Sequence, residues 1–214
     1  KRVISIRNNN NLKTSVTLNR GLRIAKGKYV VRMDADDWSY PDRLQKQYDY
    51  IEEHPNVGVS GGTIEVCDKN LRVINEREYP LTDEGVRRII FCFSPFAHPA
   101  TIWNAKIMKK VGGYNANIPL SQDCELYFKV GQSAKFGNIK EVLIKLRTHS
   151  TSSSVSKNLL QEKYAIYARI KAIIEYGYHP RFIDRLYILG RIAAMVFIPT
   201  KLKFWLFNLV RGEK

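Results

Sequence analysis

The sequence predicts an α/β protein with a mainly parallel sheet flanked by helices, followed by a helical C-terminal part. Three observations lead to this prediction. Residues 3–33 read as strand, helix and strand, the order of a right-handed βαβ unit. Three carboxylates follow the second strand directly, where open α/β sheets place their ligand sites. Residues 157–214 show apolar residues at helical spacing.

The bulk composition suits a globular protein with a basic surface. The chain has 214 residues, of which 44% are hydrophobic and 26% charged, enough for one domain with a core and an appendage. Its net charge is +15, which is typical of proteins that meet nucleic acid, anionic membranes or phosphorylated ligands. The three cysteines are widely spaced, so we expect reduced thiols in a cytosolic setting.

The first elements follow from β-branched runs and helical spacing. Residues 3–6 (Val-Ile-Ser-Ile) read as a strand, and the four asparagines 8–11 as a polar turn. Apolar residues then recur at helical spacing over 16–25, and Gly27 ends the predicted helix. Residues 29–33 are expected to form the second strand.

The acidic cluster after this strand is the first candidate site. Asp34 and Asp36 are two residues apart, so on an extended backbone they would share a face. Two carboxylates on one face can hold a hard divalent cation, which can in turn hold a phosphate. The alternative is an acidic turn that only caps the next helix.

The middle of the chain alternates strands and helices. Pro41 is expected in a first helical turn, and Thr82 is expected to begin a helix that reaches residue 93. The other predicted elements are a helix over 44–51, strands over 57–67, 71–79 and 142–147, and a short helix over 105–111.

Another helix begins near Ser121, which we expect to cap it. Asp123 then lies in the first turn, where the helix dipole favours the ionised carboxylate. An ionised carboxylate can accept a proton, which suits a general base. The alternative is a helix-start carboxylate that only caps.

Ordered motifs along the chain resemble family 2 glycosyltransferases of the GT-A fold, of the bacterial type that builds surface polysaccharides. The resemblance spans about the first 155 residues. Its motifs are residues 19–22, 25–29, 34–37, 41–45, 98–99 and 112–114, then Asp123 and residues 147–149.

The resemblance implies an inverting transfer of a sugar from a nucleotide-diphosphate sugar to a hydroxyl of a glycan or lipid-linked acceptor. It implies that Asp34 and Asp36 bind Mg²⁺ or Mn²⁺, with His149 as a further metal ligand. Asp37 is then expected to contact the donor sugar or to support the metal ligands.

The resemblance also assigns the remaining site residues. It makes Asp123 the base that takes the acceptor's proton, and it implies substrate contacts for Asn19, His98 and Gln122. A loop histidine such as His98 is otherwise expected to serve only as a hydrogen-bonding residue. The chain departs from the family pattern at Gln122, where a glutamate is usual, and at Lys13, where a glycine is common.

The resemblance further implies that a βαβ portion carrying much of the nucleotide-base pocket lies upstream, so this chain looks like a fragment. We predict a partial glycosyltransferase domain over residues 1–156 and a helical appendage over 157–214.

The appendage combines apolar and basic residues. Helices are expected over 159–176 and 187–198, and a last helix places Trp205 and three leucines on one face with lysines nearby. No apolar run reaches the roughly 20 residues that span a bilayer. This pattern favours a segment that lies in an anionic membrane surface, with packing on the catalytic domain as the alternative. We therefore expect a cytoplasmic protein, peripheral on the inner face of the inner membrane.

A rival function belongs to another class. The basic balance also fits a module that binds RNA or anionic lipid, with the acids serving as caps, or an inactive fragment of the transferase. Recognised nucleic-acid-binding motifs are absent from the sequence, so nucleic acid is the less favoured partner.

Overall fold

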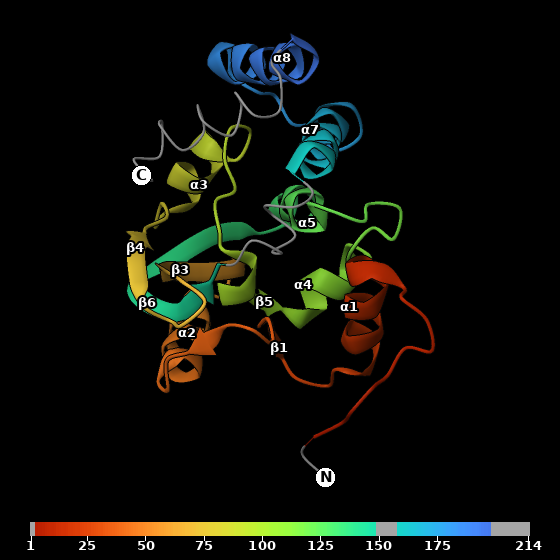
Figure 1. Ribbon diagram of the computed structural model, residues 1–214. Coiled ribbons are helices and arrows are strands. Elements are labelled where there is room, and N and C mark those ends of the chain that lie inside the picture. The colour runs from red at the N-terminus through yellow and green to blue at the C-terminus, as the bar shows by residue number, and fades with distance from the viewer. Residues whose placement is uncertain (1–2, 149–157, 198–214) are drawn as a thin grey trace.

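The computed structural model describes residues 3–148 and 158–197. A sheet occupies the middle of the molecule, with helix α2 (Arg43–Glu53) at one side and α5 (Gln122–Gly131) at the other (Figure 1). Beyond α5 lie α7 (Asn158–Ile174) and then α8 (Phe182–Phe197), which forms the far end. The α/β class predicted from the sequence is confirmed.

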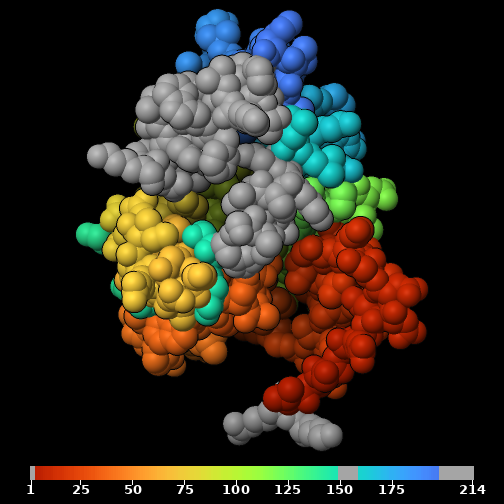
Figure 2. Space-filling view, in the orientation of Figure 1, coloured from red at the N-terminus to blue at the C-terminus, as the bar shows by residue number. Residues whose placement is uncertain are grey.

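The strand predicted over residues 3–6 is wrong. These residues form no strand, and Val3, Ile4 and Ile6 are exposed. Within the described residues no other strand pairs with them, so the ladder hydrogen bonds that define a strand are missing. This segment protrudes from the body at the end opposite α8 (Figure 2). The predicted helix that follows is confirmed as α1 (Lys13–Ile24).

The sheet has the order β1-β5-β3-β6-β2, and β4 pairs with β3 outside this path. Its strands are β1 (Tyr29–Val31), β2 (Trp38–Ser39), β3 (Val57–Cys67), β4 (Val73–Arg77), β5 (Ile102–Asn104) and β6 (Lys135–Arg147).

Strand directions in this sheet are mixed. Among the described pairs only β3 and β6 run parallel, and the other pairs are antiparallel. The expectation of mainly parallel pairing is therefore corrected. β1 and β3 still point the same way, because each is antiparallel to the β5 strand between them. Strand direction depends on which neighbours pair, and residue alternation carries no information about it.

The other helices form near their predicted positions. Thr82 caps α3 (Asp83–Ile89) by accepting a hydrogen bond from the N–H of Gly85. Asn104 caps α4 (Ala105–Lys110) in the same way. Pro41 lies just before α2 and outside its first turn, which corrects the prediction.

The main hydrophobic core lies between the sheet and the helices on the α5 side. Trp103 of β5 and Tyr127 of α5 are fully buried and stack with their ring centroids 5.5 Å apart. Ile166 and Ala172 of α7 belong to the same buried cluster, so α7 packs on the α5 side of the sheet. The division of the chain after residue 156 stays a prediction. Among the described helices none is long and apolar enough to cross a bilayer.

Candidate functional site

The acidic cluster lies in a turn directly after β1. Carboxylate oxygens of Asp34, Asp36 and Asp37 can be chosen within 4.8 Å of one another. The expectation of an extended backbone here is corrected, because the N–H of Asp37 donates to the carbonyl of Asp34, 3.4 Å away, and closes a turn. The turn brings all three carboxylates together, whereas an extended strand would have aligned two of them.

Arg32 is a site residue that the sequence reasoning missed. Its Nη1 and Nη2 atoms each lie 2.6 Å from an oxygen of Asp34, which is the fork geometry of a strong arginine–carboxylate pair. Its Nε is buried without a hydrogen-bond partner among the described residues. Spacing offered a signal, because Arg32 precedes Asp34 by two residues on the same face of an extended chain.

Asp37 is held from the other side by the end of β6. The N–H of Arg147 donates to Asp37 at 2.9 Å, and the Arg147 guanidinium donates to the backbone carbonyl of Asp36 at 2.8 Å. Burial raises the pKa of Asp37 to about 6, and the charges of Asp34 and Asp36 add to this effect. Three clustered carboxylates therefore repel one another here, which is the condition that a bound cation relieves.

A buried arginine supports the start of the acidic turn from beneath. Arg43 of α2 donates from Nη2 to the backbone carbonyls of Arg32 and Pro99, at 2.8 and 2.9 Å. Gln47 accepts from its Nε and donates to Ala100. Burial lowers the pKa of Arg43 to about 10. These bonds join the end of β1 to the short 3-10 helix His98–Ala100.

Asp123 lies in the first turn of α5, as predicted. The residue is partly buried, and removal of its carboxyl from water raises its pKa above the ordinary value. The backbone N–H groups of Asp123 and Cys124 oppose this shift, and so does the charge of Arg32. The start of the helix therefore lowers the pKa of Asp123 as expected, but burial raises it by more. Arg32 pairs with Asp34, and its charge also lowers the pKa of Asp123.

The residues around Asp123 differ from expectation in one respect. Ser121 does not cap α5 with its side chain, because its backbone is left-handed (φ 54°) and its hydroxyl donates to the carbonyl of Gln161. Gln122 is buried at the first position of the helix. Its predicted role in substrate binding stays a prediction.

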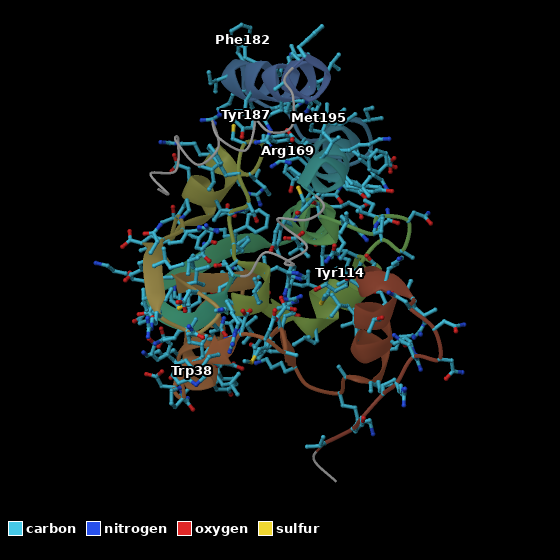
Figure 3. All side chains as sticks on the ribbon, viewed as in Figure 1. Trp38, Tyr114, Arg169, Phe182, Tyr187 and Met195 are labelled. Carbon is cyan, nitrogen blue, oxygen red and sulfur yellow. The ribbon has the colours of Figure 1, made fainter. Side chains whose placement is uncertain are left out.

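His98 is buried and bonded within the protein. Its Nε2 lies 2.8 Å from the hydroxyl of Tyr114, and burial lowers its pKa well below the ordinary value. A neutral imidazole is therefore expected at physiological pH. Figure 3 labels Tyr114 near α4 and α1. Contact between His98 and a substrate remains a prediction.

Asn19 hydrogen-bonds to both backbone groups of Tyr114. Its Oδ1 accepts from the Tyr114 N–H at 2.9 Å, and its Nδ2 donates to the Tyr114 carbonyl at 2.7 Å. Gly113 adopts φ +63°, and a Cβ there would lie 2.6 Å from Asn19 Oδ1. The pairing of residues 19 and 114 thus explains why residue 113 is a glycine. The substrate contact predicted for Asn19 stays a prediction. His149, the last predicted site residue, lies outside the described residues.

Comparison with known proteins identifies the family. Residues 1–112, more than half of the chain, match the model of "Glycosyl transferase family 2". The chain belongs to glycosyl transferase family 2.

Relatives of this family 2 chain act in more than one setting. An uncharacterized glycosyltransferase of Methanocaldococcus jannaschii is 29% identical over 78% of this chain and 58% of its own length. The amylovoran biosynthesis glycosyltransferase AmsE of Erwinia amylovora is 26% identical over 78% of this chain and 64% of its own. The O-antigen biosynthesis glycosyltransferase WbnJ of Escherichia coli is 29% identical over 66% and 56%. The chain thus spans between half and two thirds of these relatives.

Solved structures support the fold of the family 2 chain. S. aureus TarS 1-349 in complex with UDP superposes with a TM-score of 0.60 at 15% identity, over 90% of this chain and 54% of that chain. The mannosyltransferase PcManGT of Pyrobaculum calidifontis, solved with GDP-Man and Mn²⁺, gives 0.52 at 15% identity, over 86% and 50%. At this level of identity the likeness shows the GT-A fold.

The acidic turn of this family 2 chain fits a hard cation. Carboxylate oxygens are the ligands that Mg²⁺ and Mn²⁺ prefer, and three lie within reach of one point. Each oxygen of Asp34 that accepts from Arg32 keeps a further lone pair, so the ion pair does not exclude a metal. Asp36 and Asp37 belong to the same turn as Asp34. The residues present therefore fit the Mg²⁺ or Mn²⁺ ion that the resemblance implies.

Proposed function

We propose that this chain belongs to an inverting glycosyltransferase that moves a sugar from a nucleotide-diphosphate sugar to a hydroxyl of a glycan or lipid-linked acceptor in cell-surface polysaccharide synthesis. One observation carries the proposal. A turn of three carboxylates follows a strand end, and its arginine acts electrostatically on a half-buried aspartate at a helix start.

The acidic turn would hold the donor's diphosphate. Asp34 and Asp36 would ligate Mg²⁺ or Mn²⁺, with Asp37 beside them and His149 as a further ligand. A divalent cation bound there offsets the charge that grows on the leaving diphosphate. Arg32 holds Asp34 in place, and Arg147 holds the backbone of the turn.

Asp123 would act as the general base. It accepts the proton of the acceptor hydroxyl while that oxygen bonds to the anomeric carbon and the bond from this carbon to the diphosphate oxygen breaks. Attack from the face opposite the leaving group inverts the anomeric centre. A pKa raised by burial helps, because a base works best when its pKa approaches the working pH. Glu125 is not the base in this scheme, because it is turned toward α7 and ion-paired there.

We place this reaction at the cytoplasmic face of the inner membrane, since two relatives are named for amylovoran and O-antigen biosynthesis. A lipid-linked acceptor would be presented at that surface. The excess of basic residues suits anionic lipid headgroups.

Calorimetry on the full-length protein tests the function. We expect UDP- or GDP-sugars to bind in the presence of Mn²⁺ and to lose affinity when the metal is chelated. The rival function makes the opposite forecast: metal-independent binding of RNA that weakens steeply with salt. Observing RNA binding without metal-dependent nucleotide binding would reject the transferase.

A further inference from the structure

Helix α8 has one face that packs on the protein and one that does not. Asp184 and Ile188 are buried, and Met195 packs against the main core cluster. Figure 3 shows Tyr187 and Met195 on the side of α8 that faces the body, and Phe182 on the outer side. The inward face is thus accounted for by contacts within the chain.

The outward face of α8 carries apolar side chains along its whole length, with the exposed Arg185 at its edge. Exposed side chains include Phe182 at 75%, Leu189 at 61% and Phe197 at 80%. Ile183, Leu186, Ile192 and Val196 are exposed as well. A helix face that meets water is normally polar, and a continuous exposed apolar surface marks a site where a partner binds. We call these seven side chains the outer α8 surface.

The charged side chains exposed on α8 and just before it are basic. The helix has a single acidic residue, Asp184, which is only 2% exposed and ion-paired with Arg181 at 2.8 Å. The exposed charged side chains at its first turns are Arg181 and Arg185. Arg191 is partly buried against Glu162. Since Asp184 offsets the charge of Arg181 and Glu162 that of Arg191, Arg185 supplies the remaining exposed positive charge. A partner with an apolar interior and negative charge suits this surface.

We propose that the outer α8 surface docks in the plane of an anionic bilayer, with Arg181 and Arg185 at the level of the headgroups. The 16 residues of α8 give a length of about 24 Å, and a helix with apolar side chains on one face lies in the interface region. A second copy of the chain fits less well, because each copy has a net charge of +15 and would bring cationic residues together. This inference deepens the proposed function and rests on its membrane location.

The proposal narrows the membrane contact that the sequence predicted. The sequence predicted it for the whole helical appendage over 157–214, which includes α8 as well as the segment around Trp205, and the latter lies outside the described residues. The structure assigns the contact to α8, which lies at the opposite end of the molecule from α2 (Figure 1). The two assignments can be separated by single changes in the intact chain.

Co-sedimentation with vesicles of phosphatidylglycerol and phosphatidylcholine tests the proposal. We expect Leu186→Glu with Leu189→Glu to lower the vesicle partition coefficient by at least about tenfold. Burying the side chain of even one leucine is worth about this factor in a partition coefficient. Leu44→Glu is the matched control: Leu44 lies on α2 and is 60% exposed, as Leu189 is 61% exposed. The control should bind the vesicles as the wild type does. The wild type should bind less to vesicles of pure phosphatidylcholine.

A second measurement detects insertion directly. Phe182→Trp should be quenched by brominated acyl chains in anionic vesicles, whereas Leu44→Trp should not. Three results would overturn the proposal: no wild-type binding, unchanged binding of the α8 double variant, or loss of binding with Trp205→Ala alone. A wild-type dimer that the α8 changes dissociate, without vesicle binding, would assign the surface to self-association instead. None of these readouts depends on sugar transfer, and metal-dependent donor binding in the same variants tests the proposed function separately.

Discussion

Glu125 Oε1 lies 2.9 Å from Nζ of Lys171, so the helix that carries Asp123 is ion-paired with α7. The same oxygen accepts from the hydroxyl of Tyr176 at 2.6 Å and from Asn115 at 3.1 Å. Burial alone would raise the pKa of Glu125, but these hydrogen bonds outweigh it and leave the pKa below its ordinary value. The C-terminal helices therefore support the proposed base as well as the proposed membrane contact.

Breaking this pair should destabilise the protein. Lys171→Met leaves the Glu125 carboxylate, 1% exposed, without its cationic partner, and we expect a loss of about 3 kcal/mol in the free energy of unfolding. Adding Glu125→Gln should restore part of the loss, because the uncompensated charge is removed. Urea denaturation measures both. Lys46→Met, which breaks an exposed ion pair with Asp42, is the control and should change little. Equal effects at the two sites would contradict the account.

Removing one carboxylate of the acidic turn should abolish metal-dependent donor binding. In the full-length protein we expect Asp36→Asn to lose more than the roughly 10–100-fold that follows when a residue supporting a metal ligand is changed, with the fold intact. Isothermal calorimetry with Mn²⁺ and the donor measures the affinity. Asp42→Asn, at the residue just before the nearby α2, is the control. Unchanged metal-dependent affinity in folded Asp36→Asn would remove Asp36 from the metal site.

Replacing the proposed base should affect turnover and leave binding alone. We expect Asp123→Asn in the full-length protein to lower turnover at least about 100-fold, within the range of general-base catalysis, because the amide cannot take a proton. Donor affinity should change little, since the acidic turn holds the diphosphate. Gln122→Glu, which restores the residue usual in the family, should change acceptor affinity or rate if a charge matters there. Near-normal turnover of Asp123→Asn would show that Asp123 only caps the helix.

The same substitution should stabilise the folded chain at neutral pH. Burial raises the pKa of Asp123, so the folded state binds this proton more tightly than the unfolded state does. Stability is therefore lost as the pH rises from the unfolded pKa through the folded pKa, and the loss persists above it. Asparagine does not ionise and avoids this loss. Denaturation midpoints of both proteins, measured against pH without metal, should converge in acid. If Asp123→Asn were less stable than the wild type at neutral pH, the predicted direction of the stability change would be wrong.

Asn19 allows a structural role to be separated from substrate binding. Asn19→Ala removes both partners of the Tyr114 backbone, and we expect a loss of about 1–3 kcal/mol in stability with donor affinity unchanged. Thermal unfolding and calorimetry measure the two quantities. The opposite pattern, intact stability with weakened donor binding, would favour the substrate contact that the family resemblance implies.

Local sequence signals predicted much of the fold. The strand over 57–67 was predicted with the observed bounds, because its β-branched residues lie between clear turn signals. The helix start at Thr82 followed from hydroxyl and acidic residues that satisfy free backbone N–H groups. The strand over 3–6 had the same kind of residues and failed, because the described residues offer it no pairing partner.

The candidate site divides in the same way. Its residue types and their order along the chain were legible from sequence, since the acidic turn and Asp123 are local motifs. Their surroundings were not, because Arg147 and Asp37 are 110 residues apart and meet only when β6 is in place.

The sequence alone therefore indicated the family, the approximate positions of the described α-helices and the candidate residues of the proposed site, because these depend on neighbours within a few positions. Only the tertiary structure decided the strand directions, the hydrogen bonds between Asn19 and Tyr114, the ion pair of Glu125 with Lys171, and the exposed face of α8. Each of these depends on which distant segments meet. That outcome is set by the packing of the whole chain, which removes some side chains from water and leaves others exposed to it.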